Sequence, residues 1–418
     1  MMNSLLFTPI RIGKLELPGR VIKAATTEGR CNDDGSISDS MIEYHARIAE
    51  AGTPMQVIGA SYCSLRSKHA LSKQNACDSD DKIPGIRRLA AAVHRHGGKI
   101  FGQPNHPGRQ CIPRGAGIPY AQAPSRVLEP TLLTMPRPMS KDEIRETVKK
   151  WAEGAERYQK GDCDGVEIHA SQGYLITEFL TPYTNRRRDE YGGSFDNRMR
   201  FLLEVYHAIR ERVGPDYPVI MKMNGHDELL WGGLNTGELL KVAKRMQDEG
   251  IDGIELISSH YQSGLKGFRG NWRGFFTTNA TLGVGQYAKW YYRNFAKLMG
   301  PIMDWAFRNI LSRYTEGFTL KYAREFKKAL TIPVSSTGGF VHRQAMERAI
   351  ANGECDMVSI ARAIIADPYL YAHMKQGVKG PECNFCNKCL ARAMVWPIDC
   401  YDDEVREQRD RMPRSEGG

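Results

Sequence analysis

Eight short apolar runs recur along this chain, and each is followed by a segment whose apolar residues have helical spacing. Runs of this length suit strands that are buried on both faces, as in parallel sheets. Eight strand–helix units joined by right-handed crossovers predict an α/β fold, a closed (β/α)8 TIM barrel. A doubly wound sheet is the rival fold, but the near-uniform units and the absence of an early Gly-x-Gly-x-x-Gly turn disfavour it. The expected strands are 20–25, 55–60, 99–103, 165–168, 217–223, 250–257, 331–335 and 356–360.

Several expected helices have recognisable ends. Ser140 and Glu143 have the spacing of a capping box, which begins the helix after the third strand. Another helix is expected to begin at Asn197, directly after the turn Gly192-Gly193-Ser194. The remaining expected helices are 39–51, 86–96, 236–248 and 342–352, with a last one ending near residue 375.

The connection after the sixth expected strand differs from the others in length. Residues 262–320 separate the sixth strand from the helix near Lys321 and are far longer than an ordinary loop. Gly300-Pro301 interrupts a helical pattern there and predicts two short helices with a bend. Because the insertion follows the carboxyl end of a strand, we expect a helical lid over the active site, although a dimer contact uses similar helices. The apolar positions of the pattern are Ala288, Tyr291, Phe295, Leu298, Ile302, Ala306 and Ile310.

Composition narrows the class of protein. The 418 residues are 41% hydrophobic and 25% charged, as in soluble globular proteins. No apolar run approaches the ~20 residues of a membrane span, and no secretory signal is visible. We therefore expect a cytoplasmic protein that binds no membrane. The formal net charge of +10 does not indicate nucleic acid, because the basic residues are scattered and no nucleic-acid-binding motif occurs. A basic surface equally suits phosphorylated cofactors.

The stretch 164–201 carries the strongest chemical signal. A short apolar run, 165–168, is followed within six residues by His169, Gln172 and Tyr174. Polar groups at the carboxyl end of a barrel strand are typical of catalytic residues. Three hydrogen-bonding side chains that end one buried strand favour a shared target over a solvated loop.

This stretch closely resembles the Old Yellow Enzyme family, also called NADH:flavin oxidoreductases, whose members are FMN-binding (β/α)8 barrels. The family's run reads I-H-x-A-[HN]-G-Y-L, then F-L-x-P, N-x-R-x-D-x-Y-G-G-S and N-R-x-R-F. This sequence departs from it at Gln172, where the family usually has His or Asn. It keeps His169, Gly173, Tyr174, Leu175, Phe179, Leu180, Pro182, Asn185, Asp189, Tyr191, Gly192, Gly193, Ser194, Asn197, Arg198, Arg200 and Phe201.

The resemblance implies a flavin ring held at several strand ends. Ala25 and Thr27 follow the first strand, and Thr27 occupies the Thr/Cys position that touches flavin O4. Ala60 ends the second strand, where the family lays backbone against the ring. Gln103 matches the family's Gln at the pyrimidine edge. Lys222 falls where many members carry Arg facing N1/O2, and either cation stabilises an anionic reduced flavin.

The phosphate of such a cofactor is expected after strands seven and eight, the usual phosphate site of these barrels. Gly338 and Gly339 let backbone N–H groups approach a phosphate, and Ala361 precedes Arg362, which supplies a fork of donors.

The resemblance also assigns the substrate side of the site. His169 and Gln172 are placed to hold the oxygen of an α,β-unsaturated carbonyl compound while negative charge develops on it. Tyr174 then delivers a proton to the α-carbon, for which a phenol with a pKa near ~10 is suited. The alternative for Tyr174 is a core residue with a bonded hydroxyl.

Four cysteines crowd into eighteen residues near the end of the chain: Cys383, Cys386, Cys389 and Cys400. Without a signal peptide, such spacing favours a metal or cluster over disulfides. It resembles the [4Fe–4S] site of the family's larger members, the dienoyl-CoA reductases and trimethylamine dehydrogenase. Zinc and unligated thiols remain alternatives, because four thiolates suit either metal.

These features predict an FMN-binding barrel over 1–376, with its insertion at 262–320, and a Cys-rich segment over 377–418. The expected function is that of an FMN-dependent ene-reductase: NAD(P)H reduces the flavin, which passes hydride to the activated C=C bond of a small molecule. The alternatives are an amine or N-methyl dehydrogenase, and a non-catalytic barrel with a metal-binding interaction tail. A homo-oligomer is compatible with the insertion.

Overall fold

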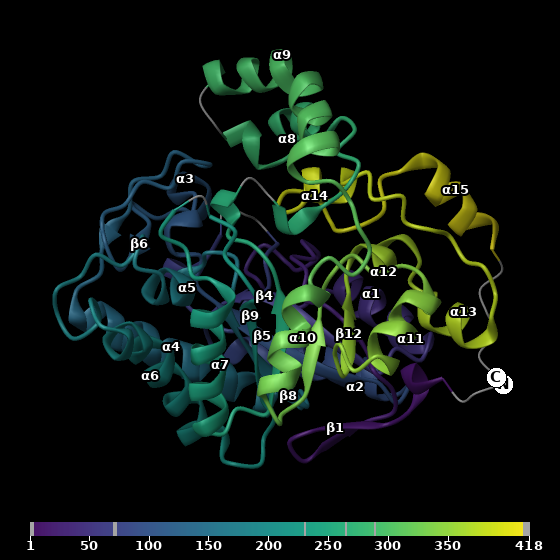
Figure 1. Cartoon of the computed structure of the whole chain (residues 1–418), viewed down its shortest axis with the longest axis horizontal. Coiled ribbons are helices and arrows are strands. Elements are labelled where there is room, and N and C mark those ends of the chain that lie inside the picture. Colours follow the sequence, from purple (N-terminus) through teal and green to yellow (C-terminus); the bar gives the residue numbers. More distant parts are fainter. Residues whose placement is uncertain (1–3, 70–72, 230, 264–265, 288–289, 413–418) are drawn as a thin grey trace.

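The computed structural model describes residues 4–69, 73–229, 231–263, 266–287 and 290–412. Eight strands close into a barrel with neighbouring strands parallel, in the order β10-β11-β12-β3-β4-β5-β8-β9 (Figure 1). The predicted (β/α)8 barrel is therefore confirmed. The strands are β3 (Val21–Lys23), β4 (Met55–Tyr62), β5 (Lys99–Asn105), β8 (Gly165–Ala170), β9 (Val219–Asn224), β10 (Gly253–Ile257), β11 (Val334–Ser336) and β12 (Met357–Ile360).

Helices surround this barrel because each presents an apolar stripe to the buried strands. The capping box of Ser140 and Glu143 is present at the start of α4. Where one last helix was predicted, the structure has two, α12 and α13. The six-residue helix α5 was not predicted. The helices of the barrel are α1 (Asp39–Glu50), α2 (Ile83–His94), α4 (Lys141–Lys160), α5 (Leu175–Leu180), α6 (Phe195–Val213), α7 (Thr236–Asp248), α10 (Leu320–Ala329), α11 (Arg343–Ala351), α12 (Arg362–Ala366) and α13 (Leu370–Gln376).

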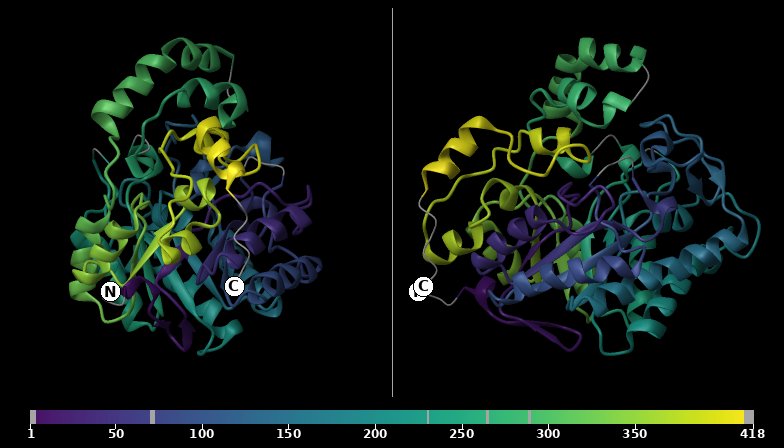
Figure 2. Two further views of the ribbon diagram at one scale, coloured as in Figure 1. Left: turned by 90° about the vertical axis from the view of Figure 1, so that its right-hand side faces the viewer. Right: turned by 180° about the vertical axis from the view of Figure 1, so that it is seen from behind.

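The amino-terminal end of the barrel is closed by a hairpin of β1 (Ile10–Ile12) and β2 (Leu15–Leu17). Ile12 and Leu17 pack with residues near the strand starts, among them Met55 and Phe101. The hairpin lies at the end opposite the insertion (Figures 1 and 2). Only the carboxyl ends of the strands are thus left to form a site.

The insertion stands above the carboxyl ends as α8 (Phe275–Leu282) and α9 (Trp290–Ala306), followed by a short π-helix at Phe307–Leu311 (Figure 1). The predicted break at Gly300-Pro301 was wrong, since α9 runs through Pro301. Packing against α8 overrides the local signal: a Cβ at Gly300 would lie 2.4 Å from Thr277 Oγ1, so the helices touch at this point. The Asp304 carboxylate also accepts hydrogen bonds from the N–H groups of Gly274 and Phe276 at the start of α8. Ala288 lies outside the described residues.

The C-terminal segment crosses the top of the barrel and contacts the insertion (Figures 1 and 2). It carries α14 (Lys388–Arg392), which contacts α8, and α15 (Asp403–Arg411), which contacts α12. Within the described part of the chain, no helix is both long enough and apolar enough to cross a membrane. Short elements in the connections are α3 (Pro113–Ala116), β6 (Gln122–Ala123) and β7 (Arg137–Pro138).

Candidate functional site

A large pocket opens at the carboxyl ends of the barrel strands. The space between its walls, with the open mouth included, is about 1510 Å³. Of the predicted site residues, the structure brings to this pocket Ala25, Thr27, Ala60, Gln103, His169, Gln172, Tyr174, Lys222, Gly339, Ala361 and Arg362. Gly338 does not line it, because its Cα faces Thr319.

The wall formed by β3, β4 and β5 is built for close approach. Thr27 forms a parallel bridge with Gly59, and Ala60 follows. A Cβ at position 59 would lie 2.5 Å from Gln103 Oε1 and 2.6 Å from the Cβ of Ala25. Only glycine lets these strand ends meet, which leaves backbone and small side chains facing the pocket. A surface of this kind suits a planar ring.

His169 is a buried, neutral donor at the end of β8. Burial, and then the cation of Lys222 on the neighbouring strand β9, hold the pKa of His169 well below its ordinary value. The ring is therefore neutral at physiological pH and has one N–H. Its Nδ1 is buried without a hydrogen-bond partner in the described part of the chain. A buried polar atom of this kind is expected to have a ligand or water as partner.

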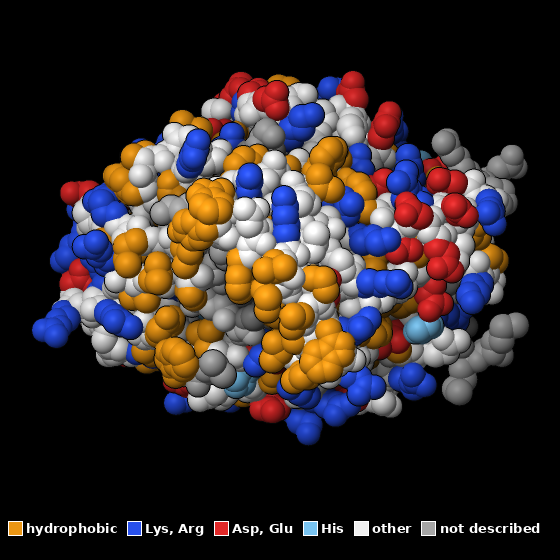
Figure 3. All heavy atoms as spheres, turned by 90° about the horizontal axis from the view of Figure 1, so that it is seen from above, with side chains coloured by type: hydrophobic (Ala, Val, Ile, Leu, Met, Phe, Trp, Pro, Cys, Tyr) orange, Lys and Arg blue, Asp and Glu red, His pale blue; other side chains and the backbone are white. Residues whose placement is uncertain are grey.

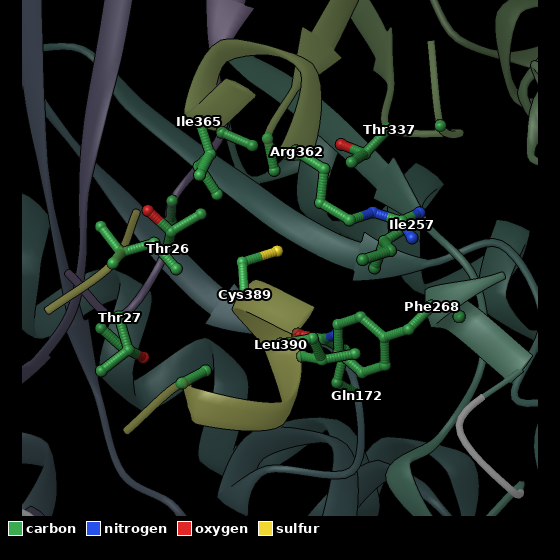
Figure 4. A pocket seen from close by; sticks show the side chains of 18 of the residues that line it. Thr26, Thr27, Gln172, Ile257, Phe268, Thr337, Arg362, Ile365, Cys389 and Leu390 are labelled. Carbon is green, nitrogen blue, oxygen red and sulfur yellow. The ribbon is translucent and has the colours of Figure 1, made fainter. Parts of the chain in front are cut away.

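Gln172 is fixed through its backbone. Its φ of 58° is unusual for a residue other than glycine. Its N–H donates to Asn224 Oδ1 at 3.0 Å, and its C=O accepts from Gln110 Nε2 at 2.8 Å and from the N–H of Tyr261 at 3.0 Å. These bonds hold the chain in a conformation that leaves the side chain in the pocket (Figure 4).

Tyr174 directly precedes α5, and its ring contacts two histidines. The ring centroid lies 4.6 Å from that of His169 and 5.3 Å from that of His69. Burial raises the pKa of Tyr174 to about 12, so the phenol keeps its proton at neutral pH. A neutral phenol in the pocket is a proton donor.

A layer of buried charges lies on the same strands. Lys222 forms an ion pair with Glu255, which also accepts from Thr337 Oγ1 at 2.9 Å, and Gln103 donates to Glu167. One oxygen each of Glu167 and Glu255 has no partner among the described residues. Burial, and then the charge of Glu255, raise the pKa of Glu167 to about 8. Sequence reasoning missed both carboxylates, although a charged residue inside an apolar run is a usable signal.

The opposite end of the pocket offers unused donors. The N–H of Gly339, which lines the pocket, donates to no acceptor in the described residues, and neither does the N–H of the preceding Gly338. Arg362 uses Nη1 for the carbonyl of Arg269 and for Asn387 Oδ1, which leaves Nε and Nη2 without a partner there. Its side chain reaches over the pocket (Figure 4). Backbone amides beside a guanidinium make up the donor set of a phosphate site.

The insertion and the C-terminal segment complete the pocket. Phe275 and Asn279 of α8 line it from above, so the insertion covers the site as predicted. Cys389, Leu390 and Met394 also line it, with the Cys389 thiol directed into the space near Thr26 and Arg362 (Figure 4). This contribution was not predicted, because no local pattern places the C-terminal segment against the barrel mouth.

The four clustered cysteines line one smaller cavity. Arg362, Ile365 and Cys389 line this cavity and the large pocket alike. Among the described residues, no three His, Cys, Asp or Glu side chains are close enough to hold one metal ion.

The architecture and the sequence lead to one family. Residues 5–272 and 287–380 match the model of the NADH:flavin oxidoreductase / NADH oxidase family. The chain belongs to this family.

Relatives within the NADH:flavin oxidoreductases act on different molecules. NADH oxidase of Thermoanaerobacter brockii is 32% identical over 386 residues, which are 92% of this chain and 52% of that protein. Cinnamate reductase of Clostridium sporogenes is 30% identical over 372 residues, 87% of this chain and 51% of that protein. The structure of 2-naphthoyl-CoA reductase superposes with a TM-score of 0.81 at 26% identity, over 98% of this chain and 58% of that one. The chain spans about half the length of these relatives.

Proposed function

We propose that this protein is an FMN-dependent NAD(P)H oxidoreductase that reduces the activated C=C bond of an α,β-unsaturated carbonyl compound. The neutral donor pair of His169 and Gln172 beside the phenol of Tyr174 is the observation that carries the proposal. Bound FMN would supply hydride transfer, accepting hydride from NAD(P)H and giving it to the alkene. The other tasks fall to side chains of this chain.

The flavin would lie against the wall formed by Ala25, Thr27 and Ala60, with Gln103 at its pyrimidine edge and Lys222 beside N1/O2. The close approach of backbone at Gly59 supports this placement. The phosphate would be held by the free N–H groups at Gly338 and Gly339, by the backbone at Ala361, and by the guanidinium of Arg362. Lys222 is not a free cation, because Glu255 neutralises much of its charge. We infer that its influence on the flavin is weaker than that of an unpaired Arg.

The substrate's carbonyl oxygen would accept hydrogen bonds from the imidazole N–H of His169 and the amide of Gln172. Because His169 is neutral, the pair donates without adding a full positive charge to the site. Donors fixed before the reaction stabilise the negative charge that develops on this oxygen. Tyr174 then gives its proton to the α-carbon. The reduction is complete when the β-carbon has gained hydride and the α-carbon a proton.

Two relatives support this substrate class. Cinnamate and 2-naphthoyl-CoA, named in those proteins, both have a carbonyl group conjugated to C=C bonds. An amine or N-methyl dehydrogenase takes hydride from a carbon bonded to nitrogen and develops no negative charge on an oxygen for the donor pair to stabilise, so we rank this activity second. The substrate is a small molecule, and no part of the proposal involves nucleic acid.

The four cysteines would hold a [4Fe–4S] cluster, which transfers single electrons. The proposal that they share one site is supported by the single cavity that all four line. Arg362 and Cys389 line both cavities, so the cluster would lie next to the flavin pocket. Asn387, whose Oδ1 accepts from Arg362 and whose Nδ2 donates to the carbonyl of Phe268, ties the cysteine loop to this position.

The variant Tyr174→Phe tests the proposal in protein loaded with FMN. Reduction of the flavin by NAD(P)H should be unchanged, because this step takes no proton from Tyr174. Reoxidation by an enone should slow by ~10²–10⁴-fold, the usual worth of a positioned general acid. Reoxidation by a quinone, which needs no proton at carbon, should stay fast. Rapid-mixing absorbance of the flavin measures each half-reaction.

The matched control is Tyr206→Phe, a tyrosine of α6 that bonds the carbonyl of Glu249 away from the pocket. It should leave both half-reactions unchanged. Enone reduction by Tyr174→Phe at the wild-type rate would exclude Tyr174 as the acid. Purified protein that stays colourless and takes up no FMN would exclude both enzyme functions.

A further inference from the structure

The outer face of α9 exposes a continuous apolar stripe. The exposed fractions are 70% for Trp290, 57% for Phe295, 77% for Leu298, 59% for Ile302 and 53% for Trp305. From Phe295 onward the spacing alternates between three and four residues, which aligns these side chains along one side of the helix. Large apolar residues are normally exposed singly, so a stripe of this kind indicates a binding surface.

The apolar stripe on α9 does not line the large pocket. The opposite side of α9 makes the contacts to α8, where Ala296 is buried and Gly300 meets Thr277. It is α8 that lines the pocket, through Phe275 and Asn279. The catalytic function proposed above therefore leaves the outer face of α9 without a role.

Basic residues accompany the stripe. Between residues 262 and 313 the sequence has eight Lys or Arg and a single acidic residue, Asp304, in a chain whose formal net charge is +10. Arg273, Lys297, Arg308 and Arg313 form no ion pair with a carboxylate within the described part of the chain. Most of the chain's excess positive charge thus lies in this one insertion.

Seen from above, apolar side chains gather on the face that carries the insertion, and Lys and Arg side chains lie around them (Figure 3). Tryptophan at an apolar face flanked by Lys and Arg is typical of helices that lie in the interface of a membrane. Such helices bury their apolar side about 5–10 Å into the lipid and use basic residues to attract anionic headgroups.

A second copy of this chain is the other candidate occupant, because the same spacing could form a helix pair. The charge argues against it: two insertions of the same strong positive sign would repel each other where they meet. An anionic surface complements both the stripe and the charge.

We propose that the outer face of α9 docks this protein peripherally on an anionic lipid surface. The docking uses a helix that lies on the bilayer and does not span it, so it agrees with the lack of a spanning helix among the described residues. It departs from the expectation of no membrane contact, which rested on the absence of long apolar runs. A short amphipathic helix with an exposed face does not need such a run.

Co-sedimentation of the full chain with vesicles tests this proposal. Vesicles of phosphatidylcholine and phosphatidylglycerol in equal parts should bind at least ten times more protein than vesicles of phosphatidylcholine alone. Lys297→Gln and Arg308→Gln should each lower binding about fivefold at low salt, the effect of one charge near such a surface. Added salt should weaken binding of the wild type.

The double variant Leu298→Asn/Ile302→Asn should lower binding at least tenfold and abolish the blue shift of tryptophan fluorescence on anionic vesicles. The control is Leu65→Asn, since Leu65 is 63% exposed outside the insertion and should be neutral. Far-ultraviolet circular dichroism checks that each variant is folded. The proposal is overturned if folded wild-type protein does not co-sediment with anionic vesicles. It is also overturned if the double variant binds them as the wild type does. A dimer that only this double variant dissociates would assign the face to a second copy.

Discussion

The two cavities above the barrel share Arg362, Ile365 and Cys389, yet they are built differently. Strand ends position the polar groups of the large pocket, and neighbours in the sheet hold them in register: Lys222 lies between His169 and Glu255. Loops and the five-residue helix α14 position the cysteines of the small cavity, and Asn387 attaches this segment to the barrel side. The large pocket is therefore preorganised by the fold, whereas we expect the small one to depend on its occupant.

Cys386→Ser tests whether the two cavities are independent, because Cys386 lines the small cavity and not the pocket. We expect complete loss of bound iron and of the cluster's visible absorption, while FMN content stays at the wild-type level. Iron analysis and flavin extraction measure the two. The matched control is Cys355→Ser, a buried cysteine outside both cavities, which should keep its iron. Equal loss of FMN in Cys386→Ser would show that the two sites form one unit.

Lys222→Met probes the large pocket. Removing the cation leaves Glu255 buried without its partner, which should lower the free energy of unfolding by about 3–5 kcal/mol. The flavin should also bind more weakly. The double variant Lys222→Met/Glu255→Gln should recover most of the stability but not the flavin affinity. Denaturant unfolding of the apoprotein and titration with FMN separate these effects, and an unchanged flavin affinity would place Lys222 away from the ring.

The sequence predicted the large pocket well because its parts follow from local patterns. Apolar runs buried on both faces mark the strands, and a polar residue directly after such a run must lie at the barrel mouth. His169 was found in this way, whereas Gln103 was assigned through the resemblance to the family. Strand edges differed by a few residues because hydrogen-bond registry decides where a strand ends; the strand expected at 20–25 is Val21–Lys23.

The rest depended on contacts between distant segments. Gly300-Pro301 indicated a break, but packing of α9 on α8 kept the helix continuous. Cys389 was assigned to a metal site alone, whereas the fold also places it in the large pocket. No spacing in the sequence encodes such a contact. The partner of Lys222 was also missed, although Glu255 stands in the middle of an apolar run and the next strand of a barrel is its neighbour.

The buried charges of the large pocket should also make stability depend on pH. The pKa of Glu167 is raised to about 8 in the folded protein by burial and by Glu255. In the unfolded chain its carboxyl group titrates near the ordinary ~4.3. Between these values the folded protein binds one proton more than the unfolded chain, so its stability falls as pH rises through this window, by at most ~1.4 kcal/mol per pH unit. Above the window the loss is complete and the slope vanishes.

Glu167→Gln isolates this contribution, since glutamine has the shape of the protonated acid and cannot titrate. Buried histidines such as His169 and His260, whose pKa values are lowered by burial, act in the opposite direction at acid pH. These histidines are present in the variant and in the wild type, so their contributions cancel in the difference between the two free energies of unfolding. We therefore expect the stability of the variant minus that of the wild type to increase from pH 5 to pH 8 and then to level off, as measured by urea unfolding of the apoproteins. Parallel profiles would mean that Glu167 is already ionised in the folded barrel, with Lys222 shared between two carboxylates.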